Sequence, residues 1–247
     1  MPDWFQTLAA GNALSTQAAD ELQARGFVVL PEVIPPGRLE PLRNAYDEAV
    51  ESTTGSDIRV GSTSTRVTDF VNRGPEFDEV YLYPPMLEAC GLVIGAPFKL
   101  SSLQARTLRA GSPAQGLHVD VARQSPDWPL LGFILMVDEF RPDNGATRFV
   151  PGSHRRTDIL AGDIPETLVR DGDQIPACGQ AGSLLVFDGS AWHGHGTNAS
   201  NRPRRSIQGA YIPRAGRAGT AFAARMQPAT RQRLSPLALY LLGITAS

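Results

Sequence analysis

The stretch Gln115-Gly116-Leu117-His118-Val119-Asp120 decides how this chain is expected to fold, because it sets a histidine and an aspartate two residues apart. On an extended strand, side chains two residues apart point to the same face, so both can reach one metal ion. A second histidine from a distant strand would complete a facial set of two imidazoles and one carboxylate. Such a set leaves one side of the metal open and is typical of non-haem Fe(II) oxygenases.

The second histidine comes from a short list, since the sequence contains only His118, His154, His193 and His195. His193 and His195 lie two residues apart on one predicted strand, so both are candidates on this reasoning. His154 ends the turn sequence Pro151-Gly152-Ser153-His154, where a structural role is expected. A histidine two residues before an aspartate also arises by chance in many sequences. The assignment of His118 and Asp120 to a metal site therefore depends on the motifs that surround them.

Short apolar runs separated by turn sequences follow one another from about residue 98 onward. The turns are rich in Gly, Pro, Asn and Asp, as in Pro142-Asp143-Asn144-Gly145. Many short strands with this punctuation predict an antiparallel sandwich or barrel, and a double-stranded β-helix (jelly roll, cupin-like) core fits, with the metal at the mouth between its sheets. The expected strands cover residues 98–109, 117–122, 130–139, 146–150, 183–187, 191–197 and 204–213.

Helices are expected on the outside of this core, so the fold class is mainly β with flanking helices. Apolar side chains at Leu39, Leu42, Tyr46 and Val50 recur at three- and four-residue steps, which is helical spacing. The expected helices cover 16–25 (capped by Ser15 or Thr16 and ended by Gly26), a segment opened by Pro35 and Pro36, 85–95 and 228–242, and a strand is expected over 27–30. The expected single domain, 1–247, has a helical N-terminal part (1–96), a jelly-roll core (97–215) and a C-terminal segment (216–247).

Composition argues against several classes of partner and site. The chain has 247 residues, 42% of them hydrophobic, and a formal net charge of −2, so neither nucleic acid nor a membrane surface is an expected partner. The longest apolar stretch, within 130–137, is too short to cross a bilayer. Cys90 and Cys178 are the only cysteines, which argues against a disulfide scaffold or a thiolate metal site. No secretory signal is recognisable at the start, so the cytoplasm is the expected compartment, and the oligomeric state is not predicted.

Arg204 stands eleven residues after His193 (204 − 193 = 11) in the basic run Arg202-Pro203-Arg204-Arg205. A 2-oxo acid can chelate Fe(II) through its keto oxygen and one carboxylate, and its far carboxylate then needs a planar, charged partner. The fork of an arginine donates two parallel hydrogen bonds to such a carboxylate. Arg204 is therefore a candidate for this contact, although it is also one arginine among many.

Three motifs in this order resemble the phytanoyl-CoA dioxygenase family of Fe(II)- and 2-oxoglutarate-dependent oxygenases, over about residues 20–215. The motifs are Gln115–Asp120, the segment Asp143-Asn144-Gly145-Ala146-Thr147-Arg148-Phe149-Val150-Pro151-Gly152-Ser153-His154, and Trp192-His193-Gly194-His195-Gly196-Thr197-Asn198 followed by Arg204. The resemblance implies that His193, with His118 and Asp120, binds the iron. His195 is then expected behind the ligands or facing solvent.

The resemblance also implies an enzyme, its co-substrates and their contacts. Fe(II), 2-oxoglutarate and O₂ would take part, and a C–H bond of a small organic molecule would be oxidised, most simply hydroxylated, with release of succinate and CO₂. Arg204 would bind the far carboxylate of 2-oxoglutarate, while Gln115 and Thr147 would contact the same molecule. Arg66 is a weaker match to a further co-substrate contact. Related halogenases have a small residue in place of Asp120, so a carboxylate here favours C–H oxidation.

The substrate and two other classes of protein stay open. A coenzyme-A thioester would require a basic mouth, which Arg214, Arg217, Arg231 and Arg233 are candidates to supply; a free small molecule, such as a secondary metabolite, is as compatible. The loops 51–65 and 155–182 are expected to border the entrance. The alternatives are a jelly-roll isomerase or hydrolase with another metal such as zinc, and a non-catalytic binding protein with a vestigial site.

Overall fold

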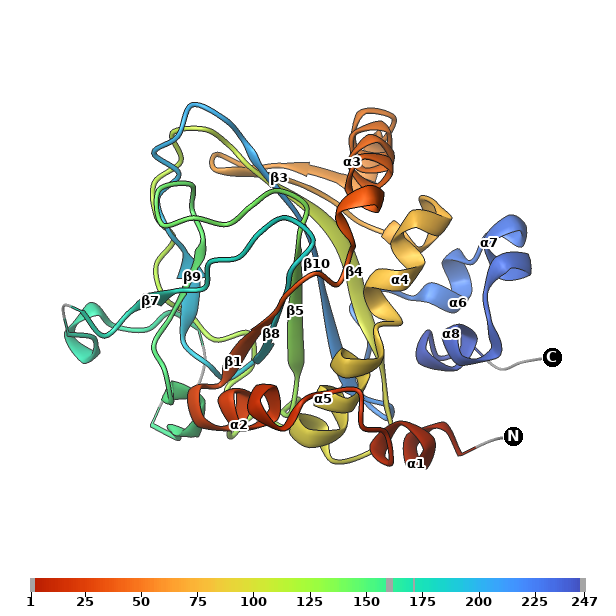
Figure 1. The fold of residues 1–247 in the computed structure, drawn as a ribbon, viewed down its shortest axis with the longest axis horizontal. Helices are drawn as coiled ribbons and strands as arrows, with labels where there is room; N and C mark the ends of the chain where they lie inside the picture. Colours follow the sequence, from red (N-terminus) through yellow and green to blue (C-terminus); the bar gives the residue numbers. More distant parts are fainter. Residues whose placement is uncertain (1–2, 159–161, 171, 245–247) are drawn as a thin grey trace.

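Two antiparallel sheets form the centre of the computed structural model, which describes residues 3–158, 162–170 and 172–244. The large sheet has the order β1 (Phe27–Leu30), β8 (Leu184–Asp188), β5 (Leu131–Met136), β10 (Arg204–Pro213), β4 (Phe98–Leu108), β3 (Ser64–Val67) and β2 (Ile58–Val60). The small sheet has the order β7 (Ile175–Pro176), β6 (Thr147–Phe149) and β9 (His193–His195). The expected mainly β class with flanking helices is confirmed (Figure 1).

The helices pack on the outer face of the large sheet, away from the small sheet (Figure 1). They are α1 (Trp4–Ala9), α2 (Thr16–Arg25), α3 (Pro36–Glu51), α4 (Asp78–Tyr81), α5 (Pro84–Ile94), α6 (Phe222–Arg225), α7 (Pro228–Arg233) and α8 (Pro236–Leu241). Strand β4 shows why the sheet has two different faces, since apolar Leu103 and Ala105 join the core under the helices. Ser102, Gln104 and Arg106 alternate with them and therefore face the space between the sheets.

Local signals explain where the early helices begin and end. The Ser15 side chain accepts a hydrogen bond from the Ala18 N–H and caps α2. Gly26 ends α2 with a left-handed φ of 84°, which glycine adopts without strain. The helix expected over 85–95 is α5, which begins and ends one residue earlier. The single helix expected over 228–242 is wrong: Leu234 and Ser235 are extended, and Pro236 opens the separate helix α8.

Two expectations for the segments around the site need correction. Residues 117–122 do not form a strand; His118 makes isolated bridges with His193 and Asp163 instead. The segment 51–65, expected as a loop, contains β2 and the start of β3, which pair as a hairpin and extend the large sheet beside β4. This hairpin brings Arg66 directly opposite Arg106.

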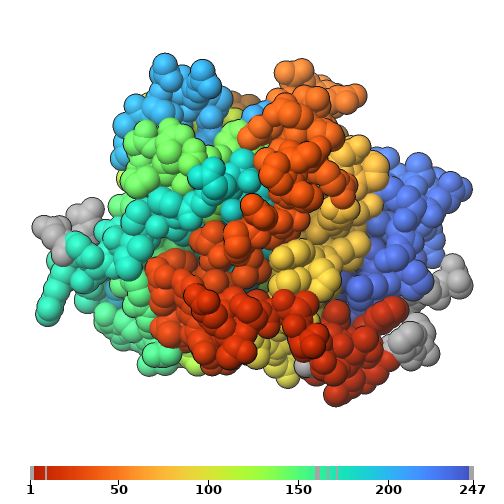
Figure 2. All heavy atoms as spheres, in the orientation of Figure 1, coloured from red at the N-terminus to blue at the C-terminus, as the bar shows by residue number. Residues whose placement is uncertain are grey.

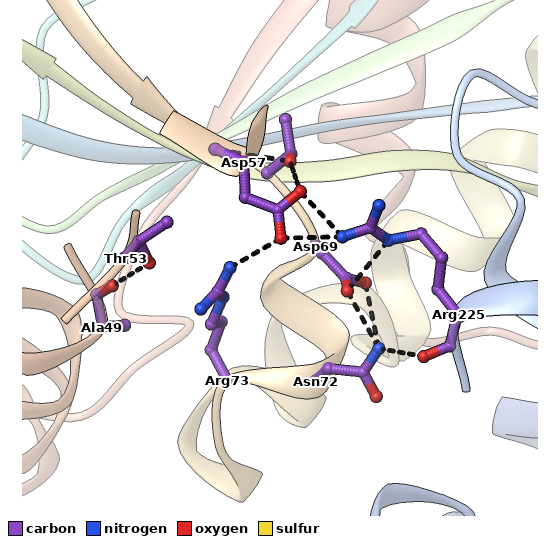
Figure 3. Close-up of polar contacts among 8 residues, drawn as sticks. Ala49, Thr53, Asp57, Asp69, Asn72, Arg73 and Arg225 are labelled. Atoms are coloured by element: carbon purple, nitrogen blue, oxygen red, sulfur yellow. Dashed lines mark hydrogen bonds and ion pairs between the residues drawn. The ribbon is translucent and has the colours of Figure 1, made fainter. Parts of the chain in front are cut away.

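The C-terminal segment is tied to the base of this hairpin by a polar network, shown in Figure 3. Arg225 donates to Asp57 at 2.7 Å and to Asp69 at 3.1 Å, and Arg73 donates to Asp57 at 3.1 Å. Asp69 is buried, holds a left-handed φ of 65° and also accepts from Asn72. Since Asp57 immediately precedes β2, the network fixes the hairpin that carries Arg66.

The space-filling view in Figure 2 shows how the N-terminal and C-terminal parts cover one side of the molecule. The red-to-orange N-terminal segment spreads across this face, and the blue C-terminal helices adjoin the yellow region of α4 and α5. Throughout the described ranges we find no helical stretch whose length and hydropathy would suit a bilayer.

Candidate metal centre

His118, Asp120 and His193 converge between the two sheets. The His118 N–H donates to the His193 carbonyl at 2.9 Å, and the His193 N–H donates back to the His118 carbonyl at 3.0 Å. The Asp120 N–H donates to the carbonyl of Gly189 at 2.9 Å, so the segment is held even though it is not a regular strand. Ligand atoms from the three side chains all lie within 4.8 Å of one another.

The backbone fixes the orientation of both imidazole rings. The Nδ1 atom of His193 lies 2.9 Å from the Ala191 carbonyl, and that of His118 lies 3.3 Å from the Gly116 carbonyl. A carbonyl only accepts hydrogen bonds, so each Nδ1 carries the proton and each Nε2 presents a lone pair. Such rear contacts are the usual means of aligning histidines for a metal ion.

The distances between the free atoms suit one ion. His118 Nε2 and His193 Nε2 lie 4.0 Å and 3.8 Å from Asp120 Oδ1. Two ligands that each bind an ion at about 2.1 Å can be at most about 4.2 Å apart, so one ion can bridge both pairs with small side-chain movements. The three residues therefore fit a metal ion of the kind that accepts imidazole and carboxylate donors.

The two histidines differ in their surroundings. His193 is buried and its ring packs against Phe149 and Phe187, at centroid distances of 5.4 Å and 4.8 Å. The side chain of His118 is 22% exposed and that of Asp120 37% exposed, so the site opens on their side. Burial, and then the neighbouring His193, lower the pKa of His118 below its ordinary value, which keeps the ring neutral and able to bind a metal at neutral pH.

A cavity of about 330 Å³ lies against the three side chains and is also lined by Gln115, Thr147 and His195. His195 is outside the metal cluster, as expected, but it is buried and lines the cavity, so the alternative that it faces solvent is wrong. Its Nδ1–H donates to the Gly196 carbonyl at 2.9 Å, and burial lowers its pKa to about 4. His195 is therefore neutral at physiological pH.

His154 has the structural place expected for it. It lies in a short 3₁₀ turn, Ser153–Arg155, and its Nε2 lies 3.2 Å from the carbonyl of Gln23 in α2. The turn thus joins the small sheet to the N-terminal helices.

Arg204 is nearly completely buried, with 1% of its surface exposed. Its guanidinium lies 3.8 Å from the centre of the Phe140 ring, and its Nε and Nη1 atoms have no hydrogen-bond partner. No carboxylate within the described ranges lies at ion-pair distance from it, and burial lowers its pKa to about 9. Arg204 is not one of the residues that line the cavity, so its charged end lies behind the wall and retains unused donors.

Arg106, which the sequence did not single out, lines the same cavity and is 9% exposed. Its Nη2 donates to Gln115 Oε1 at 3.4 Å, and its Nε has no partner. The signal was present as an alternation in β4, where polar Ser102, Gln104 and Arg106 interrupt apolar neighbours. That alternation predicts a polar inner face, but its partners across the sheet are set by register.

A second hollow of about 720 Å³ adjoins the first, and the two share Ser101, Asp120 and Leu130. Its other walls are mostly apolar or small side chains from the segments 119–127 and 212–219. Gly162 contributes to it, so a described part of the loop 155–182 borders the entrance, as expected. The segment 51–65 does not line either hollow.

Two of the four arginines considered for binding a coenzyme-A thioester make contacts within the protein instead. Arg233 donates to Asp78 at 2.9 Å, and Arg214 donates to the Tyr240 carbonyl at 2.7 Å and lies over the ring of Tyr240. Arg217 alone among the four lines the second hollow. These contacts hold the C-terminal helices in place, so the structure gives a coenzyme-A thioester little support.

Comparison with known proteins gives a consistent set of relatives. The family model described as phytanoyl-CoA dioxygenase (PhyH) matches residues 22–206. Dioxygenase trt7 of Aspergillus terreus is 30% identical over 214 residues, covering 80% of this chain and 73% of that protein. Multifunctional dioxygenase ausE of Emericella nidulans is 29% identical over 258 residues, covering 94% and 86%.

Solved structures share the fold at lower identity. HygX from Streptomyces hygroscopicus, crystallised with nickel and 2-oxoglutarate, has a TM-score of 0.68 at 15% identity, over 83% of this chain and 89% of that one. The 2-oxoglutarate-dependent carbocyclase SnoK from nogalamycin biosynthesis has a TM-score of 0.69 at 20% identity, over 90% and 92%. The epimerase SnoN from the same biosynthesis has a TM-score of 0.65 at 20% identity, over 80% and 82%. The arrangement of strands and helices is therefore that of these enzymes.

Proposed function

We propose, since this chain belongs to the phytanoyl-CoA dioxygenase family, that it is an Fe(II)- and 2-oxoglutarate-dependent oxygenase. It would oxidise a C–H bond of a small organic molecule, in the simplest case by hydroxylation, and release succinate and CO₂. One observation carries the proposal: two histidines and an aspartate converge on one point, both imidazoles present their Nε2 atoms to it, and it borders a cavity.

His118, Asp120 and His193 would hold the iron on one side and leave the cavity side free. The iron, when bound, supplies oxygen activation and electron transfer, which no side chain here can supply. The packing of His193 against Phe149 and Phe187 keeps water away from the buried side of the ion.

Arg204 would bind the far carboxylate of 2-oxoglutarate. Its buried, unpartnered donors support this, because a guanidinium without an acid partner is costly unless an anion arrives. Gln115 and Thr147 line the cavity and would orient the same molecule by hydrogen bonds. A modest side-chain movement would have to bring Arg204 to the cavity, since its end lies behind the wall in the free protein.

The adjoining hollow supports a free small molecule as the substrate rather than a coenzyme-A thioester. It is larger than the cavity at the ligands, it is mostly apolar, and it meets that cavity at Asp120 and Leu130. A substrate lying there would expose one C–H bond towards the open side of the metal. The relatives named as dioxygenases and the structural neighbours from nogalamycin biosynthesis support a role in secondary metabolism.

The test is reconstitution of anaerobically purified protein with Fe(II) and 2-oxoglutarate, followed by oxygen and measurement of succinate. Uncoupled succinate formation without substrate is expected for the native protein. Asp120→Ala should bind iron more weakly and form little or no succinate, whereas Asp20→Ala, an exposed residue of α2, should behave as the native protein. Succinate formation by Asp120→Ala at the native rate would refute the assignment.

The reaction outcome is read from the mass of the product once a substrate is found. Hydroxylation adds one oxygen atom, desaturation or ring closure removes two hydrogens, and epimerisation leaves the mass unchanged. We expect the gain of one oxygen atom, because the carboxylate of Asp120 retains the ligand set typical of hydroxylating enzymes. Either of the other two results would keep the cofactor assignment and replace the hydroxylase assignment.

A further inference from the structure

Two glutamines on the inner face of the large sheet have side chains that the fold does not use. Gln104 of β4 and Gln208 of β10 are directly opposite one another in the strand register, and both line the cavity. Both side chains are partly buried, yet neither amide makes a hydrogen bond to another residue within the described ranges. Polar groups removed from water are normally hydrogen-bonded, so this pair favours a ligand with a polar group of its own.

The pair lies beyond the reach of the co-substrate. Gln208 follows Arg204 by four residues in β10 (208 − 204 = 4), which is about 13 Å of extended strand. The guanidinium of Arg204 lies over the ring of Phe140, which follows β5 at the end of the sheet away from Gln208. The five-carbon chain of 2-oxoglutarate is only about as long as two extended residues, about 7 Å. Arg106, which contacts Gln115, stands between Arg204 and the pair, so the charged groups lie on the co-substrate side.

On its other side the pair adjoins the larger hollow. Ser102 and Ala210 form the next cross-strand pair towards that end, and their small side chains line the cavity without closing it. Ile134 is the β5 neighbour of Gln208 and also lines the cavity, and Leu130 lines both hollows. A molecule that occupies the larger hollow can therefore reach the amides while its body contacts apolar side chains.

The chemistry of two amides favours one class of polar group. Each amide has a carbonyl oxygen that accepts and an NH₂ group that donates, so the pair offers both functions. A hydroxyl group uses both, because it donates to one amide oxygen and accepts from the other NH₂ group. An ether only accepts and leaves an amide oxygen without a partner. A carboxylate also only accepts, and two neutral amides do not compensate the cost of burying its charge.

We propose that Gln104 and Gln208 bind a hydroxyl group of the organic substrate, so that the substrate class is a neutral alcohol with an apolar skeleton. This inference rests on the proposed function, because it takes the position between the metal and Arg204 to be filled by 2-oxoglutarate. The two amides hold the carbon atom that carries the hydroxyl group, and this limits which C–H bond can reach the open side of the metal. Both residues determine specificity and leave the binding of the co-substrate unaffected.

The experiment uses protein loaded with Ni(II), which fills the site without turning over, and with saturating 2-oxoglutarate. Isothermal titration calorimetry measures the binding of three alcohols, 1-adamantanol, borneol and cyclohexylmethanol, each against its methyl ether. We expect at least one alcohol to bind about 2- to 10-fold more tightly than its ether, the range of one neutral hydrogen bond. Gln104→Leu and Gln208→Leu, which keep the size of the side chain, should each reduce this preference and leave the affinity for 2-oxoglutarate unchanged. Gln17→Leu, at an exposed position of α2, is the matched control and should retain the preference.

Each other outcome overturns the inference. If none of the alcohols binds, if none binds more tightly than its ether, or if both leucine variants retain the preference, the amides do not bind a substrate hydroxyl group. If adamantane-1-carboxylate binds more tightly than 1-adamantanol, the substrate class is an acid. If either variant weakens 2-oxoglutarate as much as Arg204→Met does, the glutamines belong to the co-substrate site. Thermal unfolding checks each variant, and the two substitutions give independent readings if one of them is unstable. Failure of the native protein to bind 2-oxoglutarate is a separate result, because it refutes the proposed function.

Discussion

Replacing Arg204 by methionine should affect the free protein and the loaded protein in opposite directions. Arg204 is 1% exposed, has no acid partner among the described residues, and its Nε and Nη1 atoms find no hydrogen-bond partner there. Burial lowers the pKa of Arg204 to about 9. At about 1.4 kcal/mol per pKa unit, this shift corresponds to a cost of roughly 5 kcal/mol for keeping the guanidinium charged inside the protein. The cation–π contact with the Phe140 ring stabilises the charged form by about 1–2 kcal/mol. Arg204→Met therefore should not lower the thermal unfolding temperature of the free protein, and should raise it if the cavity around the new side chain closes.

The same substitution should strongly weaken 2-oxoglutarate. Removing one partner of a buried, hydrogen-bonded charge pair costs about 2–5 kcal/mol, which is about 30- to 4,000-fold in affinity. The assay is calorimetric titration of 2-oxoglutarate into Ni(II)-loaded protein, with unfolding temperatures measured with and without the ligand.

The adjacent Arg205 provides a matched control. It points to the other face of the sheet, where it pairs with Asp138 at 2.8 Å and Asp47 at 2.6 Å. Arg205→Met should lower the stability of the free protein by about 1–3 kcal/mol and leave the affinity for 2-oxoglutarate unchanged. If Arg204→Met binds 2-oxoglutarate like the native protein, or if its free form loses several kcal/mol of stability, then Arg204 is a structural residue and the reasoning is wrong.

Three further predictions concern the frame of the site. In Gly194→Ala the new Cβ would lie 2.8 Å from the carbonyl oxygen of Gly116, so the free energy of unfolding, measured in urea, should fall by about 1–3 kcal/mol. Metal titration should show a lower metal affinity as well. Gly37→Ala has open space around the new Cβ and should leave both quantities unchanged, so equal effects of the two substitutions would contradict this prediction. Lowering the pH should weaken metal binding, because protons compete for the imidazoles, and the lowered pKa of His118 moves its share of this competition to more acidic pH than for an ordinary histidine; a metal affinity that is the same at pH 8 and pH 5 would contradict the assignment of imidazole ligands. Arg225→Ala leaves Asp57 without its closer partner and should lower the urea midpoint by an amount equivalent to about 1–3 kcal/mol, while a change under about 0.5 kcal/mol would mean that the network is not stabilising.

The three proposed ligands were accessible from the sequence because their geometry is local. Alternation along an extended backbone places His118 and Asp120 on one face, and this holds although the segment makes isolated bridges rather than a strand. The choice between His193 and His195 depended on the family resemblance, since both lie on the same face of β9. Of these two histidines, only His193 brings its Nε2 towards Asp120 in the structure.

The features that the sequence did not predict depend on register and on contacts distant in the chain. The pairing of Arg66 with Arg106 follows from the β2–β3 hairpin, whose short, polar strands carry a weak alternation signal. The ring of Phe140 beneath Arg204 comes from a residue after β5 that forms an isolated bridge with Gly179, and no spacing rule connects Phe140 with Arg204. The break in the C-terminal helix, by contrast, had a visible cause in Ser235-Pro236, where a proline that opens one helix ends the helix before it.

The uneven exposure of the three ligands has a consequence for handling the protein. The side chain of His193 is 8% exposed and that of Asp120 37% exposed, so an ion would enter and leave on the carboxylate side. A small chelator such as EDTA should therefore strip the protein under native conditions, and soaking with a chosen salt should refill it. Spectroscopically useful replacements, such as cobalt or manganese, can then be introduced without unfolding the chain.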